Sequence, residues 1–156
     1  MIGTHLFYVG VVLATTTIVS SVSFAETPRI ISKVIPATST MVIVAEGDHE
    51  PRSLGSYSVR VYGGANPRFP YDDFIAGTVR SRDGTVDQVL FSDLNHDGSP
   101  EIVVIIRSVA TGGYLSADAF HLHSSTLLLV ESVSGLAKDA DPVRALEAKL
   151  ANQADR

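Results

Sequence analysis

The sequence has no cysteine, no run of basic residues and no recognisable catalytic motif. The absence of cysteine fits a bacterial periplasmic domain better than a small secreted scaffold, which usually relies on disulfides. The formal net charge is −5, which makes nucleic acid a poor partner and a basic protein a better one. Because no Gly-x-Ser-x-Gly elbow or nucleophile–base pattern is present, nothing in the sequence argues for an enzyme.

The amino-terminal segment carries the long apolar run of the chain. This run, residues 6–19, is too short to cross a bilayer as a helix. Ser23 and Ala25 then occupy the small-residue positions of a signal-peptidase site before Glu26. No cysteine follows the run, which rules out lipoprotein processing. We predict a cleavable signal peptide, residues 1–25, and a periplasmic protein without membrane contact after cleavage. A buried strand or an uncleaved anchor is the alternative interpretation.

The remaining residues, 26–156, contain no repeat, low-complexity tract or linker, and they predict one domain. Their hydrophobic pattern has mostly period two, which indicates strands: Tyr57, Val59 and Val61, for example, share one face of a predicted strand. We expect strands at residues 41–45, 56–62, 74–79, 86–91, 102–107, 115–123 and 126–131. Short strands at this spacing predict a mostly β fold, an antiparallel sandwich or barrel.

Two local signals mark the ends of elements. The segment Ser81–Gly84 contains Asp-Gly and predicts a hairpin turn. Near the carboxyl end, Asp141 as N-cap and Pro142 at the first helical position predict a short helix. Its apolar stripe consists of Val143, Leu146 and Leu150.

The segment 93–101, Asp-Leu-Asn-His-Asp-Gly-Ser-Pro-Glu, has the strongest general motif in the chain. Oxygen-bearing side chains recur around its glycine, which suits a hard cation such as Ca²⁺. The candidate ligands are Asp93, Asn95, Asp97 and Glu101. The last carboxylate comes at position nine and not twelve, so the segment is no EF-hand loop. The alternative is a turn without metal, in which Asp93 and Asn95 bond to backbone amides.

The histidines give a weaker signal. His121 and His123 lie two residues apart on a predicted strand, so both point to one face and could bind a transition metal. No third ligand is near them in the sequence, and we expect both rings to face solvent.

The segment Thr111-Gly112-Gly113-Tyr114 predicts a projecting loop between two strands. The glycines allow a sharp turn, and they leave a hydroxyl and a phenol at its tip. Tyrosine brings a large contact area and one polar group, which suits an interface. An ordinary Gly-Gly hairpin whose Tyr114 begins the next strand is the alternative.

Taken in order, these segments resemble the periplasmic inhibitors of invertebrate-type (I-type) lysozyme, the PliI family. The resemblance covers roughly residues 40–130, and its motifs are the strand 55–62, the turn 93–101 and the segment 107–120. The family's inhibitory loop has the pattern Ser-Gly-x-Tyr, which falls on residues 111–114. This sequence departs from the pattern at Thr111, which adds a methyl group to the expected hydroxyl.

The resemblance implies a β-sandwich of about eight strands with a short carboxyl-terminal helix, and a function without catalysis or a required cofactor. Such inhibitors insert the loop into the lysozyme groove, where its hydroxyl groups bond the two catalytic carboxylates. The expected partner is therefore an I-type lysozyme. The sequence leaves open whether the protein also forms a homodimer. A calcium-binding structural or adhesin-like β module of the cell envelope, centred on residues 93–101, is the competing hypothesis.

Overall fold

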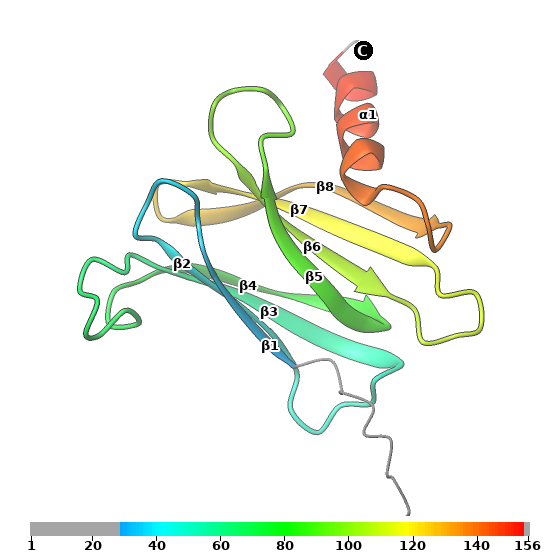
Figure 1. The fold of residues 1–156 in the computed structure, drawn as a ribbon, viewed down its shortest axis with the longest axis horizontal. Coiled ribbons are helices and arrows are strands. Elements are labelled where there is room, and N and C mark those ends of the chain that lie inside the picture. The colour runs from blue at the N-terminus through cyan, green and yellow to red at the C-terminus, as the bar shows by residue number, and fades with distance from the viewer. Residues whose placement is uncertain (1–28, 155–156) are drawn as a thin grey trace, which may run out of the picture.

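The computed structural model describes residues 29–154, which form eight strands and one helix (Figure 1). The predicted signal peptide and its cleavage site lie outside the described residues. The first sheet contains β1 (Ile30–Val34), β2 (Met41–Glu46), β3 (Leu54–Tyr62) and β4 (Phe74–Asp83). The second contains β5 (Thr85–Ser92), β6 (Glu101–Arg107), β7 (Leu115–His123) and β8 (Thr126–Leu136). Helix α1 (Pro142–Ala154) follows. Within the described range, no helix is long and apolar enough to span a membrane.

Both sheets are antiparallel meanders that pack face to face, so the prediction of a mostly β sandwich is confirmed. The alternation predicted for β3 is also correct, because Tyr57, Val59 and Val61 are fully buried between the sheets. They pack against inward-facing residues of the second sheet, such as Val104 and Phe120. Period-two patterning therefore placed the core of the sandwich correctly.

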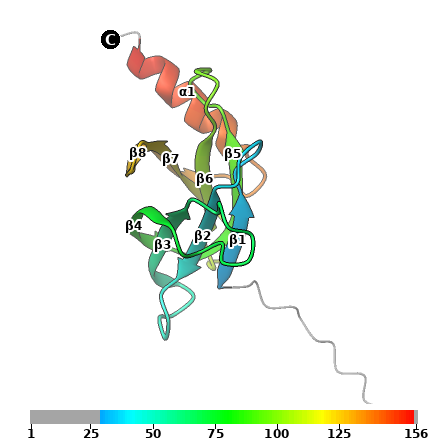
Figure 2. The ribbon, with the colours of Figure 1, turned by 90° about the vertical axis from the view of Figure 1, so that its left-hand side faces the viewer.

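Strand β6 is buried on both faces, which explains its continuous apolar sequence. Ile102, Val104 and Ile106 face the sandwich, whereas Val103 and Ile105 belong to a second cluster on the outer face. Helix α1 covers that outer face through residues that include its predicted stripe, Val143, Leu146 and Leu150. Figure 2 shows the resulting three layers, with α1 on one side of the second sheet and the first sheet on the other.

The helix begins where the sequence predicted. Asp141 accepts hydrogen bonds from the amides of Val143 and Arg144, at 3.0 and 3.3 Å, as an N-cap residue does. Near the other end, Lys149 binds the carboxylate of Glu131 on β8 at 2.9 Å. The helix is therefore fixed to the sheet by polar contacts as well as by its apolar stripe.

The prediction of a hairpin at Ser81–Gly84 is wrong. Strand β4 continues to Asp83 and β5 starts at Thr85, but the two strands belong to different sheets. Gly84, at φ 121°, forms the corner where the chain crosses from one sheet to the other. The Asp-Gly pair marked a sharp turn correctly, but local sequence does not say which strands pair across it. Strand β1 was also missed, because this edge strand is mostly exposed and lacks a regular alternation.

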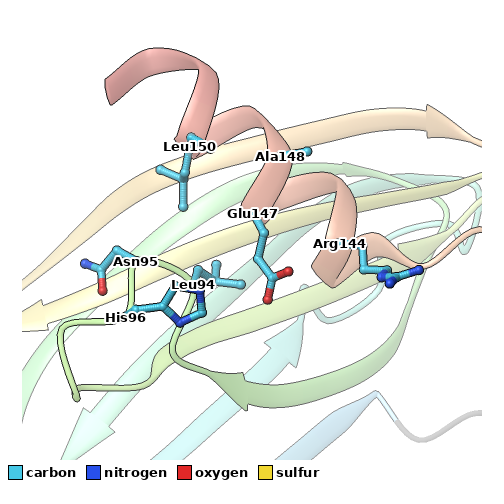
Figure 3. Close-up of a pocket in the computed structure, with 8 residues that line it drawn as sticks. Leu94, Asn95, His96, Arg144, Glu147, Ala148 and Leu150 are labelled. Atoms are coloured by element: carbon cyan, nitrogen blue, oxygen red, sulfur yellow. The ribbon is translucent and has the colours of Figure 1, made fainter. Parts of the chain in front are cut away.

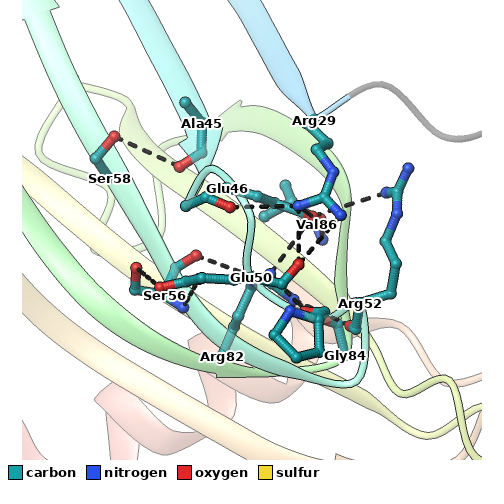
Figure 4. A network of polar contacts seen from close by, with 12 residues as sticks. Arg29, Ala45, Glu46, Glu50, Arg52, Ser56, Ser58, Arg82, Gly84 and Val86 are labelled. Atoms are coloured by element: carbon teal, nitrogen blue, oxygen red, sulfur yellow. Dashed lines mark hydrogen bonds and ion pairs between the residues drawn. The ribbon is translucent and has the colours of Figure 1, made fainter.

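A buried ionic network surrounds this corner (Figure 4). Arg82 is buried, lies 3.6 Å from a carboxylate oxygen of Glu46 and donates to the carbonyl of Gly84. The other oxygen of Glu46 accepts the amide of Val86, at 2.8 Å, so one carboxylate joins the two sheets. A side chain at Gly84 would collide with the carbonyl of Arg107. The network therefore fixes the corner at Gly84, which lies close to the end of β6.

Candidate functional site

The loop between β6 and β7, residues 108–114, projects from one end of the second sheet (Figure 1, right). The amide of Gly113 donates to the carbonyl of Ala110 at 2.9 Å, which closes a four-residue turn. Thr111 and Gly112 are the central residues of this turn, and Thr111 is exposed. The structure therefore brings the predicted loop residues together, with the Thr111 hydroxyl at the tip.

Tyr114 lies at the base of the turn and folds back over it. Its carbonyl accepts the amide of Ser108 at 2.9 Å, so Tyr114 precedes β7 and is not part of the strand. A Cβ at Gly112 would collide with the Tyr114 ring, and Gly113 has φ 55°, which favours glycine. The two glycines thus have different roles: one makes room for the ring and the other completes the turn. The ring remains 56% exposed.

A side chain that the sequence analysis missed supports the base of the loop. The guanidinium of Arg107 pairs with Asp87 on β5, with an N–O distance of 2.9 Å. It also lies 3.5 Å from the carbonyl of Gly113 and 3.4 Å from that of Lys138, as a donor to both. Arg107 therefore joins the loop to β5 and to the segment before α1. The basic residue that ends this strand after five apolar residues was a usable signal, but its partners are distant in sequence.

The candidate calcium loop lies at the opposite end of β6. Both carboxylate oxygens of Asp93 accept backbone amides, from Asp97 at 3.0 Å and from Gly98 at 2.9 Å. The side-chain oxygen of Asn95 also accepts the amide of Asp97, at 3.0 Å. The amide of Ser99 and the side-chain amide of Asn95 donate to Asp97 and hold the pKa of that carboxyl below its usual value. These are the bonds expected of the metal-free turn, and calcium binding at this loop stays a prediction.

Glu101 and His121 form a pair across two strands that the sequence analysis did not foresee. Ile102 pairs with Phe120 in the β6–β7 ladder, which places Glu101 opposite His121. The Nδ1 atom of His121 lies 3.0 Å from one oxygen of Glu101, while the other oxygen accepts the amide of Leu94 at 2.8 Å. The expectation that His121 faces solvent is therefore wrong, because its ring is half-buried against Glu101. His123 is exposed, as expected.

Two of the surface hollows that adjoin these loops lie against α1 or the segment before it. The larger, about 640 Å³, lies between the Leu94–His96 segment and α1, where Glu147 points toward the loop and Arg144 also lines the hollow (Figure 3). The smaller, about 300 Å³, lies beside Asp87 and Arg107, and Asp139 and Asp141 also line it. The smaller hollow adjoins the base of the loop 108–114, and Arg107 and Lys138 line it together with the three aspartates.

Comparison with known proteins identifies one family. The model of the family described as periplasmic lysozyme inhibitor of I-type lysozyme (PliI) matches residues 29–150. A crystal structure of such an inhibitor from Aeromonas hydrophila is similar, with 45% identity and a TM-score of 0.70 over 75% of this chain and 98% of that one. The Aeromonas hydrophila inhibitor in complex with Meretrix lusoria lysozyme is similar with the same identity and TM-score, over 76% and 94%. No curated protein sequence matches the chain.

Proposed function

The chain belongs to the PliI family of periplasmic inhibitors of I-type lysozyme, and from this membership we propose that it binds and inhibits an I-type lysozyme in the periplasm. On this proposal the protein acts by binding and catalyses no reaction. The complex of its Aeromonas hydrophila relative with Meretrix lusoria lysozyme supports a lysozyme as the partner here.

The proposed inhibitory element is the loop Thr111–Tyr114. Glycoside hydrolysis uses two carboxyl groups that flank the scissile bond. A loop that enters the groove and donates hydrogen bonds to both carboxylates blocks the substrate and occupies both groups. The Thr111 hydroxyl and the Tyr114 phenol are the two donors. Hydrogen bonds to charged groups contribute about 1.5–3 kcal/mol each.

The observation that carries this proposal is the exposed Tyr114 ring folded over Gly112. An exposed tyrosine ring beside a turn offers a large contact area and one polar group, and tyrosine is enriched among residues that dominate binding interfaces. The turn bond from Gly113 to Ala110 and the contact of Arg107 with the loop also fix the backbone before any partner arrives. An ordered loop loses less conformational entropy on binding, which favours affinity.

Electrostatics favour the same partner. The chain has a formal net charge of −5. Lysozymes act on an anionic polymer and are usually basic, so opposite charges would raise the rate of encounter. The association rate should therefore fall as ionic strength rises.

The direct test is inhibition of purified I-type lysozyme by the purified protein, with chicken-type and goose-type lysozymes as controls. We expect inhibition of the I-type enzyme and much weaker inhibition, or none, of the other two. If no I-type lysozyme is inhibited although the protein is folded, the proposed function is wrong. Equal inhibition of all three types would contradict a site specific to this partner.

A further inference from the structure

A second cluster of side chains lies at the end of the sandwich opposite the loop 108–114. It contains Asp97 from the β5–β6 connection, Glu101 at the start of β6 and His121 on β7. One ligand atom from each side chain lies within 4.8 Å of the other two. Two carboxylate oxygens and one imidazole nitrogen thus converge from three segments of the chain.

The chemistry of this set differs from that of a calcium site. Ca²⁺ takes six to eight oxygen ligands, and an imidazole nitrogen is a poor substitute. Zn²⁺ binds histidine nitrogen and carboxylate oxygen readily, and three protein ligands with a water molecule in the fourth position complete its tetrahedral coordination. The nitrogen of His121 therefore favours zinc over calcium at this cluster.

The charge at Glu101 also calls for a cation. This side chain is only 1% exposed, and a buried carboxylate needs a compensating charge. Among the described residues, no lysine or arginine forms an ion pair with Glu101; His121 is the partner that the structure gives it. A divalent ion between the two side chains would supply that charge.

The cluster is accessible and its ligands are held in place. A hollow of about 360 Å³, lined by Gly98, Pro100, His121 and the turn between β1 and β2, opens beside it. This leaves room for a water molecule as a further ligand. The amide of Leu94 fixes one oxygen of Glu101, which leaves the other directed at His121. The amide of Ser99 orients the carboxylate of Asp97 at 2.7 Å.

We propose that Asp97, Glu101 and His121 form a zinc site that fastens the β5–β6 connection to β7. The ion would replace the direct contact between Glu101 and His121 and would bind both side chains and Asp97 at once. The site lies at the far end of β6 from the loop 108–114, so zinc binding is separate from the inhibition proposed above. Its occupancy should raise the melting temperature without changing the inhibition constant.

The test is a Zn²⁺ titration of the purified protein against a chromophoric chelator, for the parent and for His121→Gln. We expect one ion per chain, and a loss of affinity of roughly a hundredfold or more in His121→Gln, because a ligand is removed. The matched control is His123→Gln, whose ring is exposed, lies two residues further along the same strand and stacks on His121. This control should bind Zn²⁺ like the parent.

A Co²⁺ titration of the parent provides a readout that does not depend on any variant. Visible absorption typical of low-coordinate Co²⁺ with a nitrogen ligand, removed by added Zn²⁺, would support the site. Absence of Zn²⁺ binding by the parent, or equal affinity in parent and His121→Gln, would overturn the proposal. Stabilisation by Ca²⁺ alone, unchanged in His121→Gln, would also overturn it, in favour of the oxygen-only loop site.

Discussion

Replacement of Tyr114 by alanine should cost most of the inhibitory affinity and little of the stability. A buried tyrosine covers about 200 Å², so an exposed fraction of 56% leaves about 110 Å² for a partner. A lysozyme that covers half of this area gains about 1.4 kcal/mol at about 25 cal/mol per Å². One hydrogen bond from the phenol to a carboxylate adds about 1.5–3 kcal/mol. We expect a loss of about 3–4 kcal/mol, or roughly 150- to 1000-fold in the inhibition constant.

The variant Tyr114→Phe separates the two contributions. It keeps the ring over Gly112 and removes only the phenol oxygen. We expect its inhibition constant to rise by roughly 10- to 150-fold, the equivalent of the charge-assisted hydrogen bond alone. The assay is steady-state inhibition of an I-type lysozyme, with melting curves measured on the same protein samples.

The matched control is Phe69→Ala. Phe69 is 55% exposed, close to the value for Tyr114, but it lies in the connection between β3 and β4 at the other end of the sandwich. This variant should inhibit like the parent. Our reasoning is refuted if Tyr114→Ala also inhibits like the parent, or if it loses inhibition only in proportion to the fraction of unfolded protein.

Three further outcomes follow from other parts of the chain. Arg107→Gln should weaken inhibition about two- to tenfold. Without this side chain the loop is less ordered, and ordering it on binding costs about 0.5–1.5 kcal/mol. The control is Arg80→Gln, whose side chain is exposed to nearly the same extent and which should inhibit like the parent. Burial raises the pKa of Glu131, but the amide of Ser132 and the ammonium of Lys149 lower it more, so the net shift is downward. The stability that Glu131 contributes is therefore present above about pH 4.5 and is lost as the pH falls below this value. Urea unfolding at several pH values should show that the free energy of unfolding falls less steeply with acid in Glu131→Gln than in the parent. An equally steep fall in both proteins would contradict this. Mass spectrometry of periplasmic extract should find Glu26 at the amino terminus, and a membrane-bound chain that begins at Met1 would refute the predicted cleavage.

Much of the architecture followed from patterns within single segments. Alternation identified the buried face of β3, and Asp141 with Pro142 identified the start of α1. Such signals are reliable because they depend on neighbours within a few residues. The Asp-Gly pair before β5 shows the limit, since it marked a turn but not the passage from one sheet to the other.

The same distinction, between local sequence signals and tertiary contacts, applies to the two sites. The sequence by itself determined that a turn lies at residues 111–114, because two adjacent glycines allow a sharp change of backbone direction. Only the tertiary structure decided that Gly112 makes room for the Tyr114 ring and that Arg107 supports the loop through Asp87. These contacts depend on how side chains fold back and on which strands lie together.

The pairing of Glu101 with His121 was likewise decided only by the fold. Twenty residues separate them, and their contact depends on the register of β6 against β7, in which Ile102 meets Phe120. A shift of that register by one residue would move His121 to the other face of the sheet. The sequence determines which side chains can bind or hydrogen-bond, because that is a property of each residue. Which side chains meet is determined by strand register and sheet packing. Both depend on the burial of apolar residues along the whole chain.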